Sequence, residues 1–180
     1  MGCLLVRVLS LLAALLLVIQ PAQAVLNDDR YDGNIYALYA GNGSLVPPAN
    51  PLSDSLEQGR TAVIVYYLDD SAVSKRFAPV VSELQRLWGR NIDLLPLTID
   101  PLQGRDATGP ADPASYWHGL IPQVVVIGPD GQVMFDQEGQ VPLDEINSVI
   151  SQATGLPAPE LPSLDQEGSF NEVNIEVTSG

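Results

Sequence analysis

Residues 61–79 read TAVIVYYLDDSAVSKRFAP, and this stretch decides the fold of the chain. Thr61–Leu68 is an almost unbroken apolar run. Such a run is typical of a strand that is covered on both faces of a parallel or mixed sheet. The residues after Leu68 are more polar and repeat with helical spacing. The sequence therefore predicts a strand that leads directly into a helix.

The predicted helix continues to Trp88 and ends at Gly89, with Ser71 or Asp70 as its N-cap. Its apolar residues recur every three or four positions, as expected for one buried face: Val73, Phe77, Val80, Val81, Leu84, Leu87 and Trp88. Pro79 lies inside the helix, where it lacks an N–H and crowds the carbonyl of Lys75, so we expect a kink there.

The rest of the chain predicts an α/β fold. A glycine- and proline-rich loop follows the second strand, and Pro129-Asp130-Gly131 marks a tight turn between the last two strands. The further strands are expected at 92–99, 121–127 and 132–137, and a final helix at 143–154. This order predicts a mixed central sheet with helices on both faces.

The region 61–155 resembles the thioredoxin family. Ser71 and Ser74 occupy the positions of the two redox cysteines, and Pro79 matches the proline in the family's active-site helix. Gly119-Leu120-Ile121-Pro122 resembles the loop that carries the family's cis-proline, and Val65 stands where active members have a buried carboxylate. The resemblance implies a thioredoxin-like fold without disulfide exchange, because a serine hydroxyl does not supply the thiolate that exchange needs.

A second resemblance narrows the family. Tyr31–Pro48 reads YDGNIYALYAGNGSLVPP. Together with residues 66–71 and 80–100, this segment is similar to the cyanobacterial thylakoid membrane photosystem I accumulation factor, a thioredoxin-like family with a hydrophobic N-terminus. The resemblance implies a role in the biogenesis or stable accumulation of photosystem I. Photosystem I subunits or other assembly factors would then be the partners.

Residues 25–60 form an extension before the thioredoxin-like region. Asn34–Tyr39 predicts a strand, followed by a glycine-rich turn. Pro47, Pro48 and Pro51 then interrupt regular structure. Asp54 with Glu57 predicts the capped start of a short helix that ends at Gly59.

Residues 1–24 have the pattern of a secretory signal. Val8–Ile19 is apolar, and Ala22-Gln23-Ala24 has the small-x-small pattern that precedes a cleavage site. We expect either cleavage after Ala24 or an uncleaved N-terminal membrane anchor. Either outcome predicts a location on the lumenal or periplasmic side of the thylakoid or plasma membrane. Cleavage would remove Cys3, the single cysteine of the chain.

The formal net charge of −14 at pH 7 excludes nucleic acid as a partner bound by charge attraction. Residues 156–180 are predicted to form a flexible acidic tail, because Pro157–Gly180 contains three prolines, five acidic residues and no Lys or Arg. The alternation of Val173, Ile175 and Val177 leaves an alternative, in which the tail adds an edge strand to the sheet of a partner.

The candidate binding site is a groove between the start of the helix at residue 71 and the loop at 119–122. Its predicted lining consists of Tyr67, Lys75, Arg76, Ile121 and Pro122. Without cysteines, such a groove would still hold an extended peptide through backbone hydrogen bonds and apolar contacts. Lys75 and Arg76 would give it a positive charge, although a solvated helix face explains these two residues equally well.

Two other candidate sites have simpler explanations. Ser71 or Ser74 would act as a nucleophile only with a base, for which His118 is the one histidine of the chain. The simpler alternative is that Ser71 caps the helix and His118 lies on a surface loop. Asp69, Asp70 and Asp100 would suit a hard cation, but capping carboxylates explain them without a metal.

The sequence therefore predicts a thioredoxin-like assembly or stability factor for a membrane complex, with no catalytic activity, cofactor or metal. The alternative is an exported thioredoxin-fold oxidoreductase or transferase, which would act through a bound thiol cofactor or a cysteine of its partner.

Overall fold

A computed structural model of the 180-residue chain describes residues 25–161. The predicted signal or anchor at 1–24 and the predicted tail from 162 onward lie outside the described residues. Within 25–161 no helix has the length and apolar character needed to cross a membrane.

The central sheet contains four strands, in the order β2-β1-β3-β4. They are β1 (Ala62–Tyr67), β2 (Asp93–Thr98), β3 (Gln123–Ile127) and β4 (Val133–Glu138). The strand β1 pairs in parallel with β2 and antiparallel with β3, which in turn pairs antiparallel with β4. This parallel strand–helix–strand unit followed by an antiparallel hairpin and a helix is the thioredoxin-like arrangement. The predicted fold class is confirmed.

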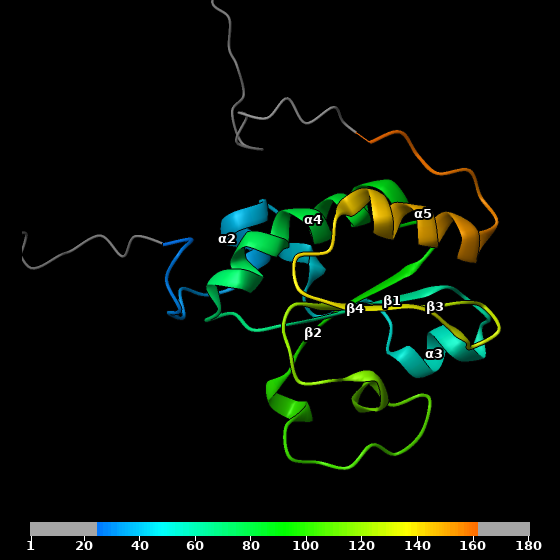
Figure 1. The fold of residues 1–180 in the computed structure, drawn as a ribbon, viewed down its shortest axis with the longest axis horizontal. Coiled ribbons are helices and arrows are strands. Elements are labelled where there is room, and N and C mark those ends of the chain that lie inside the picture. The colour runs from blue at the N-terminus through cyan, green and yellow to red at the C-terminus, as the bar shows by residue number, and fades with distance from the viewer. Residues whose placement is uncertain (1–24, 162–180) are drawn as a thin grey trace, which may run out of the picture.

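Helices cover both faces of the sheet (Figure 1). On one side lie α2 (Ile35–Ala40), α4 (Ala72–Trp88) and α5 (Leu143–Thr154); on the other lie α3 (Leu52–Glu57) and the long loop after β2. Three short 3-10 helices complete the fold: η1 (Gly43–Leu45), η2 (Asp100–Leu102) and η3 (Pro113–Tyr116).

Alternate residues of β1 supply two separate apolar cores. Val63, Val65 and Tyr67 pack toward α2, α4 and α5, whereas Ala62, Ile64 and Tyr66 pack toward α3. Every residue of β1 is buried, as the unbroken apolar run predicts. The indole Nε1 of Trp88 donates to Asn147 Oδ1 at 2.7 Å, which ties α4 to α5 inside the first core.

The prediction of a strand at Asn34–Tyr39 is wrong, because these residues begin helix α2. Asn34 caps this helix: its Oδ1 accepts the N–H groups of Tyr36 and Ala37 at 2.9 and 3.2 Å. Helical spacing buries Ile35 and Tyr36 in the core shared with α4, and this burial outweighs the strand preference of β-branched and aromatic residues.

One predicted helix start and one predicted capping bond differ from the structure. Helix α3 begins at Leu52 with Pro51 as its N-cap residue, so Asp54 lies inside the first turn instead of capping it. Ser71 does occupy the N-cap position of α4, but its side chain makes no capping hydrogen bond. The bounds of α4 and α5 agree with the prediction, and α4 continues through Pro79.

Candidate functional site

The two serines at the former redox positions differ in exposure. Ser74 is buried, and its hydroxyl oxygen accepts the N–H of Leu68 at 3.2 Å. Ser71 is half-buried at the start of α4. The Ile121–Pro122 peptide bond is cis, as the resemblance to thioredoxins implies. The frame of the redox site is therefore present, with hydroxyl groups in place of thiols.

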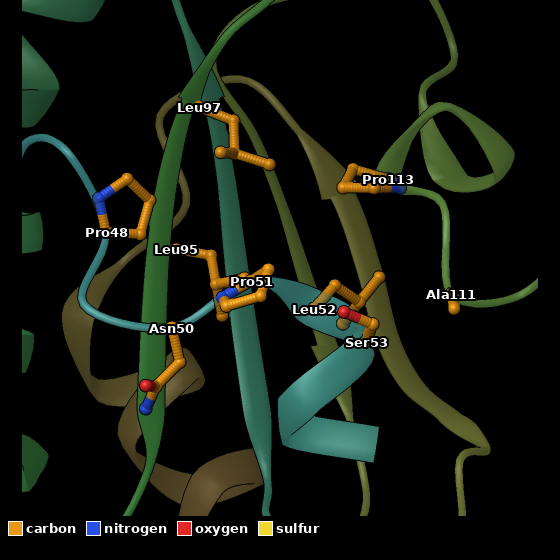
Figure 2. Close-up of a pocket in the computed structure, with 9 residues that line it drawn as sticks. All are labelled: Pro48, Asn50, Pro51, Leu52, Ser53, Leu95, Leu97, Ala111 and Pro113. Carbon is orange, nitrogen blue, oxygen red and sulfur yellow. The ribbon is translucent and has the colours of Figure 1, made fainter. Parts of the chain in front are cut away.

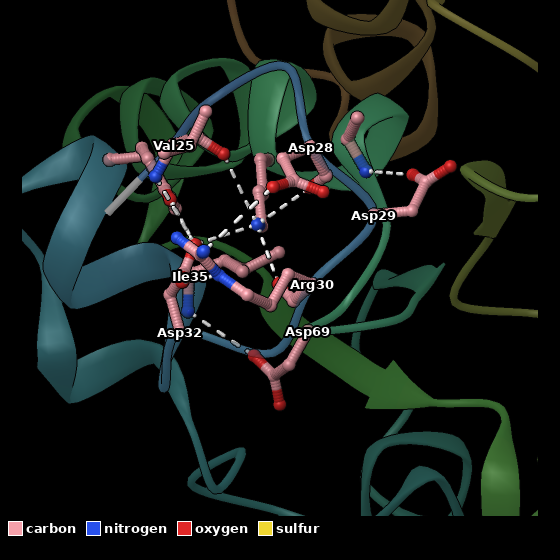
Figure 3. A network of polar contacts seen from close by, with 10 residues as sticks. Val25, Asp28, Asp29, Arg30, Asp32, Ile35 and Asp69 are labelled. Carbon is pink, nitrogen blue, oxygen red and sulfur yellow. Dashed lines mark hydrogen bonds and ion pairs between the residues drawn. The ribbon is translucent and has the colours of Figure 1, made fainter. Parts of the chain in front are cut away.

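Residues 25–33 lie across the start of α4 (Figure 3). We call residues 25–33 the strap. Asp29 of the strap caps the helix, because its Oδ1 accepts the N–H of Ala72 at 2.8 Å. One turn further along, Arg76 Nη1 donates to Asn27 Oδ1 at 3.3 Å. The favourable position for an anion at this helix N-terminus is thus taken by a side chain of the same molecule.

Lys75 fastens the strap to α4. Its side chain is 0 % exposed. The ammonium lies 2.7 to 3.3 Å from three strap carbonyl oxygens, those of Val25, Asp28 and Arg30. It also lies 2.8 Å from Asp32 Oδ2. A buried lysine is costly unless it is paired and hydrogen-bonded, and here the strap supplies all four oxygens.

Asp32 is the charged centre of this cluster. Besides the bond from Lys75, its carboxylate accepts hydrogen bonds from the Tyr39 hydroxyl at 2.8 Å and from Arg30 Nε at 3.1 Å. The Lys75 ammonium and then the Tyr39 hydroxyl hold the pKa of Asp32 well below its usual range. Burial opposes the charged form of Lys75, but the contacts with Asp32 and Tyr39 outweigh it and raise the Lys75 pKa. Both groups are therefore charged at neutral pH.

The predicted open groove needs correction at two residues. Lys75 is buried under the strap, so the prediction of an exposed charge there is wrong. Tyr67 is also buried; its ring packs edge-on against Tyr36 with 5.0 Å between ring centroids. Burial raises the pKa of Tyr67. Sequence reasoning missed both because the covering groups come from the strap and from α2, which was predicted as a strand.

The other three predicted groove residues differ in exposure. Arg76 is exposed and Ile121 is half-buried. Pro122 is buried, and its carbonyl oxygen accepts the N–H of Gly139 at 2.7 Å. Of the five predicted groove residues, Arg76 is therefore the one that is exposed.

His118 is paired with a carboxylate of β4. Its Nε2 lies 2.7 Å from Asp136 Oδ2, and Gln123 Nε2 donates to the other oxygen of Asp136 at 2.7 Å. Within residues 25–161 no hydrogen bond joins His118 to Ser71 or Ser74. The arrangement required for a serine nucleophile with a histidine base is not formed in this part of the chain.

The three aspartates considered for a cation do not form a metal centre. Asp69 Oδ1 accepts the N–H of Ile35 at 3.2 Å, and burial raises the Asp69 pKa. In the described part of the chain, no group of three or more His, Cys, Asp or Glu side chains is placed to hold a metal ion. Asp69 instead helps to fix the start of α2.

A pocket of about 360 Å³ lies on the opposite face of the sheet (Figure 2). Its lining is dominated by three prolines and three leucines: Pro48, Pro51, Pro113, Leu52, Leu95 and Leu97. Sequence reasoning missed this pocket because its residues come from the extension, β2 and the loop after β2. The scattered prolines were the available signal, but nothing in the sequence indicates that they meet.

Comparison with known proteins identifies one relative over most of the chain. The sequence is 38 % identical over 157 residues to the thylakoid membrane protein slr1796 of Synechocystis. The match covers 87 % of this chain and 78 % of that protein. No protein-family model matches the chain.

Two solved structures resemble the fold. The exposed lipoprotein thioredoxin Etrx1 of Streptococcus pneumoniae aligns with a TM-score of 0.45 and 15 % identity, over 56 % of this chain and 89 % of its own. A redox protein from Chlamydomonas reinhardtii aligns with a TM-score of 0.46 and 13 % identity, over 65 % of this chain and 36 % of its own.

Proposed function

Because this chain belongs to the family of the Synechocystis thylakoid membrane protein slr1796, we propose that it is a non-catalytic thioredoxin-like factor that acts at the thylakoid membrane. Its proposed task is to assemble or stabilise a membrane complex, photosystem I. The proposed partners are photosystem I subunits or other assembly factors. Residues 1–24 would direct the protein across the membrane or anchor it, and the folded part would then lie on the lumenal or periplasmic side.

The observation that carries the non-catalytic part of this proposal is the closed state of the former redox site. Ser71 and Ser74 replace the thiols, and Asp29 caps the helix end at which a redox thiolate would be stabilised. The buried Lys75 holds the covering strap in place. A thioredoxin-fold enzyme needs access to this helix end, so these features weigh against the alternative of an oxidoreductase or transferase.

The thioredoxin-like frame would then serve as a binding surface. The strap contributes three carboxylates, those of Asp28, Asp29 and Asp32, and Asp69, which holds the start of α2, adds a fourth beside them. Arg30 of the strap and Arg76 of α4 are exposed cations beside them. Mixed charges of this kind at the edge of an interface steer a partner and fix its orientation more than they add affinity.

An affinity experiment tests the proposed partner. The tagged full chain is used to recover proteins from solubilised thylakoid membranes, and photosystem I subunits and assembly factors are quantified by mass spectrometry. We expect these proteins to copurify with the wild-type chain. Arg76→Glu should reduce their recovery by about two- to fivefold, the range for a single exposed charge at an interface.

Arg90→Glu is the matched control, because Arg90 is an exposed arginine just beyond the other end of α4. Its recovery of partners should equal that of the wild type. If no photosystem I subunit and no assembly factor copurified, the proposed function would be contradicted. Equal losses in the two variants would show that the start of α4 is not the contact surface.

A further inference from the structure

We propose that the pocket lined by three prolines and three leucines binds the hydrocarbon chain of an uncharged lipid. This pocket lies on the α3 side of the sheet, away from the strap and the former redox site (Figures 1 and 2). The proposal is therefore independent of whether the start of α4 contacts a protein partner.

The lining of the pocket suits an apolar ligand. Leu52 and Leu95 are buried and belong to the second apolar core, and half-buried Leu97 packs against it. The lining contains no charged side chain. A pocket of about 360 Å³ lies at the lower end of the range of about 300–1,000 Å³ for small-molecule sites. It therefore has room for part of a hydrocarbon chain, whose transfer out of water is favourable.

Three polar groups of the residues that line the pocket have hydrogen-bond partners. Asn50 Nδ2 donates to Asp93 Oδ1 at 3.2 Å, and the hydroxyl of Ser53 donates to Asp54 Oδ1 at 3.1 Å. The carbonyl oxygen of Pro113 accepts the Tyr66 hydroxyl at 2.6 Å. A bound peptide would bring amide groups that need hydrogen bonds of their own, and this lining offers few. A hydrocarbon chain makes no such demand.

The neighbouring sheet edge also disfavours a peptide. Strand β2 is an edge strand, and the N–H groups of Asp93 and Ile99 donate to β1, to the carbonyls of Thr61 and Tyr67. Backbone N–H groups point alternately to the two sides of a strand, so the backbone nitrogen of residue 96 faces outward, away from β1. Proline at that position supplies no donor, so the centre of this edge cannot complete a ladder with an added strand.

The pocket wall formed by the loop after β2 is held in place by Asp112. Its carboxylate accepts two hydrogen bonds from the Arg105 guanidinium, both at 2.6 Å, and further bonds from the N–H groups of Thr108 and Ala114. These contacts hold the Asp112 pKa well below its usual range. Because these contacts fix the loop, binding would have little of this wall to order.

The charge of the protein selects an uncharged lipid over an anionic one. The chain has a net charge of −14, and Asp54 lies next to Ser53 at the pocket. An anionic headgroup held at the mouth would be repelled by this field. The polar side chains that line the pocket are the uncharged amide of Asn50 and hydroxyl of Ser53, which suit an uncharged headgroup.

The test uses the full chain with ¹³C-labelled leucine methyl groups, observed by NMR. The probes are monodecanoylglycerol, which is uncharged, and decanoate, which has the same chain with a carboxylate. We expect saturable shifts of the methyl signals of Leu52, Leu95 and Leu97 with monodecanoylglycerol. Decanoate should bind more weakly. Absence of saturable shifts at these leucines, or tighter binding of decanoate, would overturn the proposal.

Two tryptophan substitutions in the loop after β2 locate the site. Ala111 lines the pocket and Ala107 does not, although both are exposed. Ala111→Trp should weaken binding by about tenfold or more by filling the mouth, whereas Ala107→Trp should leave it unchanged. Ser53→Trp, from an exposed residue of α3, is the second blocking variant in case Ala111→Trp does not fold. Equal affinity in the blocking and control variants would contradict the assignment.

A capped trileucine peptide distinguishes a protein partner from a lipid. If this peptide shifts the same leucine signals at a lower concentration than monodecanoylglycerol, the pocket docks a protein and the lipid proposal is wrong. If monodecanoylglycerol binds more tightly, the proposal holds.

Discussion

Replacing Lys75 by methionine is expected to lower the melting temperature by about 10 °C, because breaking a buried ion pair from one side is strongly destabilising. Methionine keeps most of the length and apolar stem of lysine but has no N–H donors. The carboxylate of Asp32 and the strap carbonyls would lose the ammonium that they share in the wild type. Unpaired polar groups of this kind are costly when they stay buried.

The strap should therefore leave its place on α4 in the Lys75→Met variant. Hydrogen exchange of the amides in residues 25–33 is the local measurement, and it should become much faster. Arg90→Met is the control, since Arg90 is an exposed arginine just beyond the other end of α4. The role assigned to Lys75 would be contradicted if both variants showed similar small changes in melting temperature and the strap amides stayed protected from exchange.

Acidification is expected to destabilise the protein through aspartates on both faces of the sheet. The pKa values of Asp32, Asp93 and Asp112 are lowered in the folded state. A carboxyl group with a lowered folded-state pKa contributes stability above its unfolded pKa, about 3.9 for aspartate, and loses that contribution as the pH falls further. Asp69, whose pKa is raised by burial, opposes this trend but is one group against three.

Melting temperatures between pH 7 and pH 3 test this expectation. The wild type should lose stability steeply below about pH 4.5. Asp32→Asn and Asp112→Asn should each melt at a lower temperature at pH 7 and show a shallower decline in acid. Glu138→Gln, which changes an exposed carboxylate of β4, is the control and should follow the wild-type curve. Parallel curves for all four proteins would contradict the assignment of acid sensitivity to these aspartates.

The strand β1 and the helix α4 were predictable because the spacing of their apolar side chains reflects which of their faces are buried. The apolar run at 61–68 predicts burial on both faces, and the spacing from Val73 to Trp88 predicts the face of α4 that packs on the sheet. The serines at 71 and 74 also show directly that thiols are absent from these two positions. These features depend on local spacing, which a sequence shows.

The contacts that close the former redox site were not predictable in the same way. Three of the four oxygens around Lys75 belong to main-chain carbonyls 45 to 50 residues earlier in the chain. Carbonyl groups are present at every residue, so they leave no pattern in the sequence. The cluster of charges at 28–32 was the available signal, but a solvated acidic segment explains it equally well without the structure.

Complementation of a deletion strain tests the central claim, that the protein supports photosystem I without thiol chemistry. The gene is deleted, and photosystem I is measured per cell from the light-induced absorbance change of its primary donor. Because Cys3 is the single cysteine of the chain, Cys3→Ser gives a protein with no thiol. The account predicts that deletion lowers photosystem I and that Cys3→Ser restores it as fully as the wild-type gene. An unchanged photosystem I level after deletion, or restoration by the wild type but not by Cys3→Ser, would contradict it.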